Sequence, residues 1–155
     1  MISGKLFKTV AASVLVLGLG VGFAYAGADE MIQARQAQMK AQGKAIGALV
    51  AIIKGEAPYD AAVIKASMDA MKAAADTAMA ANGWSADSLN GATIETWAKP
   101  EIWSDAEGFK AAYGALVKAE DGVAASTDEA SFTAAFGELG GACKNCHEKF
   151  RRPKG

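Results

Sequence analysis

The sequence holds few of the residues that define several common protein classes. Its 155 residues include only 2 cysteines and 1 histidine, which excludes a dense disulfide framework and a metal site built from several histidines. Lysine and arginine number 16 against 17 acidic residues, so the basic excess typical of nucleic-acid-binding domains is absent. With 3 prolines and 52% hydrophobic residues, the chain is neither disordered nor collagen-like. Its length suits one domain with its own core.

The N-terminal stretch has the pattern of a secretory signal. Lys5 and Lys8 form a positive region, residues 10–22 form an acid-free apolar run, and residues 24–26 read Ala-Tyr-Ala, a cleavage signature. The run is short for a transmembrane helix, and the alternative is an uncleaved N-terminal anchor. We predict removal of residues 1–26, export to the periplasm, and a mature domain over 27–155 without a membrane span.

The mature part is rich in helix-forming residues, and it shows no convincing strand pattern and no internal repeat. Between the second and third predicted helices lies an irregular stretch, 83–103, which holds all three tryptophans. A loop of that length in a small domain usually has a function. Mostly short connections between helices predict an all-α, antiparallel four-helix bundle. The apolar spacing places its helices over about 29–54, 60–82, 104–122 and 126–152.

Local signals predict where these helices begin and end. Asp60 is the expected N-cap of the second helix, and Asn82, followed by glycine, is its expected stop. Ser-x-x-Glu capping boxes that begin at Ser104 and Ser126 predict the starts of the third and fourth helices. Pro153 is expected to end the last one. In the first helix, residues spaced seven apart predict the buried face: Ile32, Met39, Ile46 and Ile53.

The last predicted helix carries a motif with specific chemistry. Residues 143–147 read Cys-Lys-Asn-Cys-His, which is the C-x-x-C-H motif of c-type haem attachment. Cysteines at i and i+3 share one helix face, so Cys143 and Cys146 can each form a thioether to one haem. The adjacent His147 then directs its imidazole at the iron. Because His147 is the only histidine, ligation by two histidines is excluded.

Three other uses of the two cysteines fit less well. A thioredoxin-like C-x-x-C requires strands that the pattern does not predict. A disulfide between cysteines three apart within a helix has strained geometry. A zinc site requires more soft ligands than two cysteines and one histidine. We therefore predict one covalently attached haem c as the cofactor.

With this motif on its last helix, the chain resembles the class II cytochromes c, the cytochrome c′ family. An exported four-helix bundle with C-x-x-C-H near its C-terminus is similar to that family, and mitochondrial-type cytochromes instead have the motif near the N-terminus. Three further stretches match: 54–60 (Lys-Gly-Glu-Ala-Pro-Tyr-Asp), 99–103 (Lys-Pro-Glu-Ile-Trp) and 146–151 (Cys-His-Glu-Lys-Phe-Arg). The resemblance covers essentially the whole mature chain.

The resemblance implies roles for several residues outside the motif. Arg35 and Gln36 match positions that contact the haem or its propionates, and Thr96 is a candidate for the haem edge. Arg151, one helical turn after His147, matches an arginine on the proximal side. The alternative for Arg35 and Gln36 is an ordinary helix surface, and for Arg151 a solvated residue that favours the helix dipole.

Whether Met39 binds the iron distinguishes two functions that the resemblance allows. It occupies the family's distal position, where high-spin members leave the iron five-coordinate and low-spin members use a methionine as sixth ligand. Met39 can also be core packing alone. We predict that Met39 binds the iron as its sixth ligand, and that the protein transfers electrons between redox partner proteins and is not an enzyme. The alternative is a five-coordinate protein that binds nitric oxide or carbon monoxide. The family also implies a possible homodimer through the first helix.

Overall fold

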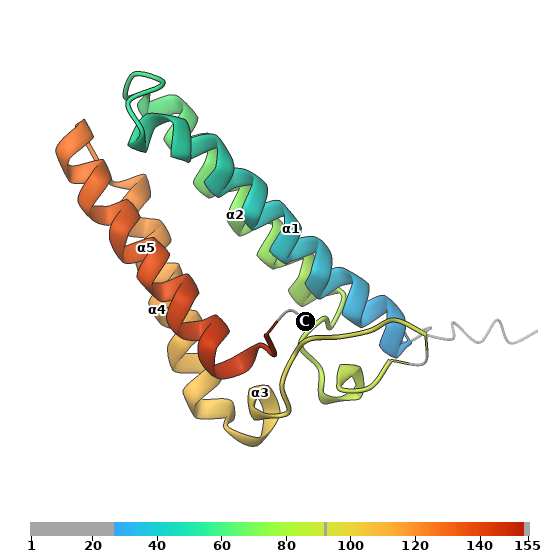
Figure 1. The fold of residues 1–155 in the computed structure, drawn as a ribbon. Helices are drawn as coiled ribbons and strands as arrows, with labels where there is room; N and C mark the ends of the chain where they lie inside the picture. The colour runs from blue at the N-terminus through green and yellow to red at the C-terminus, as the bar shows by residue number, and fades with distance from the viewer. Residues whose placement is uncertain (1–26, 92, 154–155) are drawn as a thin grey trace, which may run out of the picture.

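The computed structural model describes residues 27–91 and 93–153, so the predicted signal over 1–26 lies outside the described residues. Helices α1 and α2 form one long antiparallel pair and α4 and α5 another, and the two pairs run alongside each other (Figure 1). The predicted all-α, antiparallel four-helix bundle is therefore confirmed. The described part of the chain contains no helix long and apolar enough to cross a membrane. The elements are α1 (Ala28–Ile53), α2 (Ala61–Ala80), the 3₁₀ turn η1 (Ala86–Ser88), α3 (Glu101–Ser104), α4 (Ala106–Ala124) and α5 (Glu129–Phe150).

Both predicted ends of α2 are confirmed. The carboxylate of Asp60 accepts hydrogen bonds from the amides of Ala62 (2.8 Å) and Val63 (3.2 Å), as an N-cap should. At the other end Asn82 adopts a left-handed φ of 53°, and the next amide, that of Gly83, donates to the carbonyl of Ala78 over 2.8 Å. The chain therefore leaves α2 abruptly and enters the long loop.

The predicted start of the third long helix is wrong by two residues. Ser104 is the last residue of the short helix α3, and Asp105 caps α4 by accepting from the amide of Gly108 at 3.1 Å. A carboxylate at a helix N-terminus accepts a charge-assisted hydrogen bond and also opposes the helix dipole. The aspartate that directly follows the serine therefore takes the capping position.

The predicted start of the fourth helix fails for the same reason. Asp128 rather than Ser126 caps α5: its carboxylate accepts from the amide of Ser131 at 2.8 Å, and the Ser131 hydroxyl accepts from the Asp128 amide at 3.2 Å. The Ser126 hydroxyl instead donates to the carbonyl of Val123, at the end of α4. Helix α5 also ends at Phe150, before Pro153, because the extended Arg151 pairs with Ala98 in an isolated bridge.

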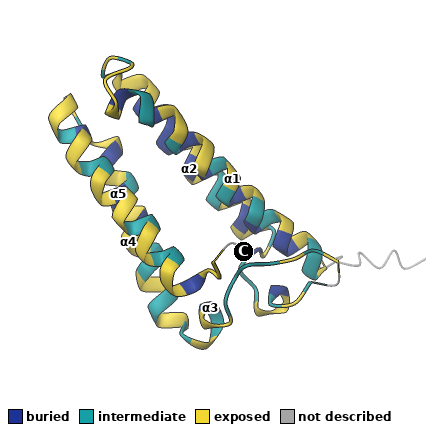
Figure 2. Ribbon diagram, viewed as in Figure 1, coloured by how far each residue is buried: buried dark blue, intermediate teal, exposed yellow. Residues whose placement is uncertain are grey.

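The core lies between the helix pairs, on the sides that Figure 2 shows as buried. Burial on α1 differs from the predicted row of residues seven apart: Ile32 is fully buried, but Ile53 is 36% exposed. The buried stripe of α1 includes three polar residues, Arg35, Gln38 and Gln42. The apolar core draws on all four long helices, through Ala45, Leu49, Ile52, Ile64, Met68, Met71, Leu116, Ala119, Val123, Phe132 and Leu139.

Candidate haem-binding site

The attachment motif lies in the last turns of α5. Cys143, Cys146 and His147 are all half-buried, and both thiols are free. Cys143 packs against the edge of the hydrophobic core. Cysteines three apart on one helix lie one above the other on the same face. The two cysteines and His147 therefore lie along one edge of α5, between its buried and its exposed face.

The surroundings of these three residues favour their neutral forms. Burial raises the pKa of the Cys143 thiol, and the negative charge of Glu120 raises it further. Burial also raises the pKa of the Cys146 thiol. Burial lowers the pKa of the His147 imidazole, and the positive charge of Arg151 acts in the same direction. A neutral imidazole has the free nitrogen lone pair that an iron ligand requires.

The segment 93–99 of the long loop, here called the linking segment, is anchored on α1 at its start. The Thr93 amide and hydroxyl both donate to the carboxylate of Asp29. The Gln36 side-chain amide donates to the carbonyl of Glu95 at 2.8 Å, and the Arg35 guanidinium donates to the Thr96 hydroxyl at 2.9 Å. Arg35, Gln36 and Thr96, predicted separately from sequence, therefore lie together.

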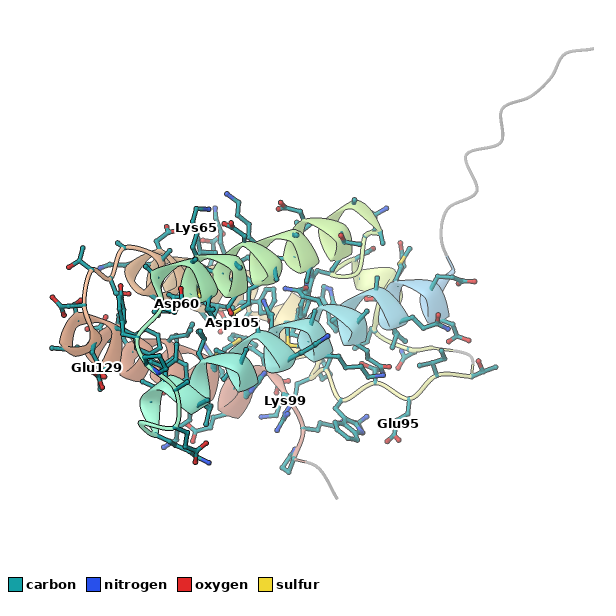
Figure 3. The ribbon with its side chains drawn as sticks, turned by 90° about the horizontal axis from the view of Figure 1, so that it is seen from above. Asp60, Lys65, Glu95, Lys99, Asp105 and Glu129 are labelled. Atoms are coloured by element: carbon teal, nitrogen blue, oxygen red, sulfur yellow. The ribbon has the colours of Figure 1, made fainter. Side chains whose placement is uncertain are left out.

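The other end of the linking segment is anchored on α5. The Lys99 amide donates to the carbonyl of Phe150 at 2.9 Å, and the Arg152 amide donates to the carbonyl of Trp97 at 2.7 Å. Figure 3, which labels Glu95 and Lys99, shows the segment passing below α1 toward the end of α5. The linking segment thus joins the first turns of α1 to the residues that follow the C-x-x-C-H motif.

Arg35 is the centre of the loop's attachment to the bundle. Arg35 is only 5% exposed, and its guanidinium donates to the Gly83 carbonyl (2.6 Å) and the Ser88 hydroxyl (2.7 Å) as well as to Thr96. It also lies over the rings of Trp84 and Trp103, at 5.4 and 5.7 Å from their centroids. Arg35 therefore holds the loop in place, and its contact with haem stays a prediction, as do those of Gln36 and Thr96.

Arg151 is close to the imidazole, as predicted, but by a different geometry. It is an exposed, extended residue after the end of α5 and not part of a further helical turn. Its amide donates to the His147 carbonyl at 3.0 Å. Arg151 and His147 line one open surface depression together with Lys99, Lys144 and other residues.

The residues present fit a covalently bound haem. Cys143 and Cys146 are placed to carry two thioethers, and His147 is a neutral imidazole on the same helix. The described residues contain no cluster of three His, Cys, Asp or Glu side chains that could hold a metal by itself. Half-buried apolar side chains on the same two helices suit a flat apolar ring: Met39 and Ile46 on α1, Phe136 and Ala142 on α5.

Glu120 is a half-buried residue on the inner face of α4 that was not predicted from sequence. It shares the inner face of α4 with Leu116, Ala119 and Val123, at the i, i+3, i+4 and i+7 spacing of a buried stripe. Burial raises its pKa from 4.5 to about 7, and the nearby Asp121 adds to the shift. A glutamate within an otherwise apolar stripe was the available signal.

Replacing Glu120 with glutamine is expected to change how stability depends on pH. A raised pKa means that the folded chain retains a proton that the unfolded chain releases, so stability falls as the pH rises from about 4.5 to about 7. Glu120→Gln should therefore raise the urea midpoint more at pH 8 than at pH 4.5. The control is Glu138→Gln, at an exposed site on α5. An equal change at both pH values would contradict the placement of Glu120.

Comparisons with known proteins agree with this site. A family model described as Cytochrome C' matches residues 30–151. Cytochrome c′ of Rubrivivax gelatinosus is 37% identical over 125 residues, which cover 79% of this chain and 94% of that protein. Cytochrome c-556 of Agrobacterium fabrum is 34% identical over 149 residues, covering 95% and 97%.

A solved structure shows the same architecture. It is a nitric oxide complex of a mutant cytochrome c prime from Alcaligenes xylosoxidans, and it matches with a TM-score of 0.72 at 31% identity, over 83% of this chain and 99% of that one. The match confirms the bundle around the site, and members of the matched family carry one covalently bound haem c. With Cys143, Cys146 and His147 as its attachment motif, the chain belongs to the cytochrome c′ family.

Proposed function

We propose that this chain is a five-coordinate haem protein that binds nitric oxide or carbon monoxide on the side of the haem that faces α1. The observation that carries the proposal is the structural match to a nitric oxide complex of a relative. The composition supports it, because His147 is the only imidazole in the chain and no second histidine is present to occupy the opposite side. The protein then acts by binding a gas and not as an enzyme.

Each part of the site has a task in this function. Haem supplies an iron that accepts a diatomic ligand. Cys143 and Cys146 would hold the ring against the core, and the neutral imidazole of His147 would bind the iron from α5. The apolar residues around Cys143 would exclude water from the attachment face of α5. The linking segment fixes α1 relative to the end of α5, which sets the space available to a ligand.

A second candidate function keeps Met39 as an axial ligand. Its thioether is half-buried on α1, one turn after the fixed Arg35, and a thioether is an established haem ligand that raises the reduction potential. The protein would then be an electron carrier between redox partner proteins.

The optical spectrum of the purified holoprotein separates the two functions. A five-coordinate protein is expected to be high-spin at neutral pH and to bind carbon monoxide readily in the ferrous state, and Met39→Leu should leave its spin state unchanged. Sharp α and β bands in the reduced protein that disappear in Met39→Leu would overturn the gas-binding proposal and establish Met39 as a ligand.

Cellular location is part of the same proposal. Proteins of this family are periplasmic, and the pattern over residues 1–26 is that of a cleaved signal. The intact mass of the exported protein should equal a chain that begins at Gly27 plus one haem. A mass that includes residues 1–26 would contradict cleavage. A homodimer through α1 stays a prediction.

Replacing Arg151 with leucine is expected to lower the reduction potential of the haem with little loss of stability. The positive charge beside His147 disfavours the additional positive charge of the ferric state, so its removal favours oxidation. Redox titration at low salt should show the shift, and Arg151→Lys should retain most of the wild-type value. An unchanged potential in Arg151→Leu would leave Arg151 as a surface residue.

A further inference from the structure

Gln42 has an unused hydrogen-bond donor inside the bundle. Its side chain is on the inner face of α1 and only 8% exposed, and its Nε2 atom is buried without an acceptor. Buried amide donors are nearly always paired, because an unpaired one has lost its water without compensation. We therefore expect the Nε2 of Gln42 to donate to an acceptor that the described residues do not supply.

The second unpaired amide, that of Gln38, has a structural role as well. Gln38 is 1% exposed, and its Oε1 accepts from the indole Nε1 of Trp84 at 3.1 Å. The phenol of Tyr113 also interacts with Gln38. These contacts fix Gln38 between α1, the start of the long loop and α4, so Gln42 is the better candidate for contact with a ligand.

The position of Gln42 brings its donor toward the haem side of α1. Residues three apart on a helix are surface neighbours, so Gln42 lies next to the half-buried Met39. Helices α1 and α5 run in opposite directions along the same side of the bundle, and the middle turns of α1 lie level with the turns of α5 that carry the motif (Figure 1). Gln42 thus lies on the buried stripe of α1, beside Met39, which occupies the distal position that the family resemblance implies.

We propose that Gln42 donates a hydrogen bond through Nε2 to a ligand bound at the haem iron on the α1 side. This inference rests on the proposed gas-binding function and adds a preference among the ligands that the iron can bind. Ligands that accept hydrogen bonds, such as small anions and polarised diatomic molecules, gain affinity from this donor. The donor is uncharged, so it acts over the whole neutral pH range.

The test uses the holoprotein with two probes, fluoride for the ferric state and carbon monoxide for the ferrous state. Gln42→Met keeps the side-chain size and removes the donor. Fluoride affinity should fall about tenfold or more, as expected for the loss of one hydrogen bond to a charged acceptor. The infrared stretching frequency of bound carbon monoxide should rise, because the donor near its oxygen weakens the C–O bond. Gln33→Met, at an exposed site on α1, is the matched control and should change neither value.

Stability measurements give an independent readout. Without added ligand, Gln42→Met should be at least as stable as the wild type, since it replaces an unpaired buried amide with an apolar group. Gln38→Met should lower stability, because Trp84 loses its acceptor, and should retain fluoride affinity. Wild-type affinity and carbon monoxide frequency in Gln42→Met would overturn the inference alone. A low-spin wild type that binds neither probe would overturn the proposed function and this inference with it.

Discussion

Replacing both Cys143 and Cys146 with alanine is expected to yield a chain with no covalently bound haem and a much lower melting temperature. Both sulfurs are free and half-buried, on the face of α5 that the macrocycle would cover. Without the macrocycle, the apolar surface that it would cover stays in contact with water, and that burial no longer contributes to stability. Each kcal/mol lost lowers the melting temperature of a domain of this size by about 2–4 °C. Intact-mass analysis and thermal unfolding followed by circular dichroism measure the two effects.

Single variants separate the two sulfurs. Cys143→Ala and Cys146→Ala should each retain one thioether, so each should keep haem covalently but in smaller yield. Asn145→Ala, at the exposed position between them, is the matched control and should bind haem as the wild type does. Full haem incorporation in the double variant after denaturation would show that another side chain carries the attachment.

The features that could be predicted from sequence are those encoded locally. Two cysteines three apart and the histidine after them define the attachment chemistry within two helical turns, whatever the rest of the chain does. Both ends of α2 could also be predicted, because Asp60 and Asn82 act on amides and carbonyls within a few residues. Helix starts were missed where a serine and an aspartate compete within two positions, as at Ser104 and Ser126.

The features that escaped prediction depend on distant partners. Gln42 and Glu120 are polar residues, so their types indicate exposure, yet the bundle places both on inner helix faces. The resemblance assigns Arg35 a contact with haem, which stays a prediction, and nothing in the sequence predicts its contacts with the loop. Its partners lie 48 to 61 residues further along the chain, beyond the reach of helical periodicity. The partners of the Arg35 guanidinium are therefore known only from the folded structure of the loop.

Replacing Arg35 with methionine is expected to lower the free energy of unfolding by about 3 kcal/mol. The change removes the donor to the Ser88 hydroxyl and the short hydrogen bond to the buried Gly83 carbonyl, which then has only the Ser88 hydroxyl at 3.4 Å. A buried polar group that loses its partner costs about 1–3 kcal/mol. The change also removes the cation between the rings of Trp84 and Trp103. Part of this loss is offset because the variant no longer buries a charge. Urea unfolding measures the difference.

A local readout distinguishes loss of the loop from general weakening of the bundle. Without Arg35, the segment between Gly83 and Thr96 loses its central attachment to α1, so limited proteolysis should cleave there first while the long helices stay intact. Arg35→Lys retains the charge but not the fork of donors, and it should fall between the wild type and Arg35→Met. Lys40→Met, at an exposed site on α1, is the matched control and should stay within about 0.5 kcal/mol of the wild type. If Arg35→Met matched that control in both measurements, the contacts of the loop with Asp29, Gln36 and α5 would be sufficient to hold it.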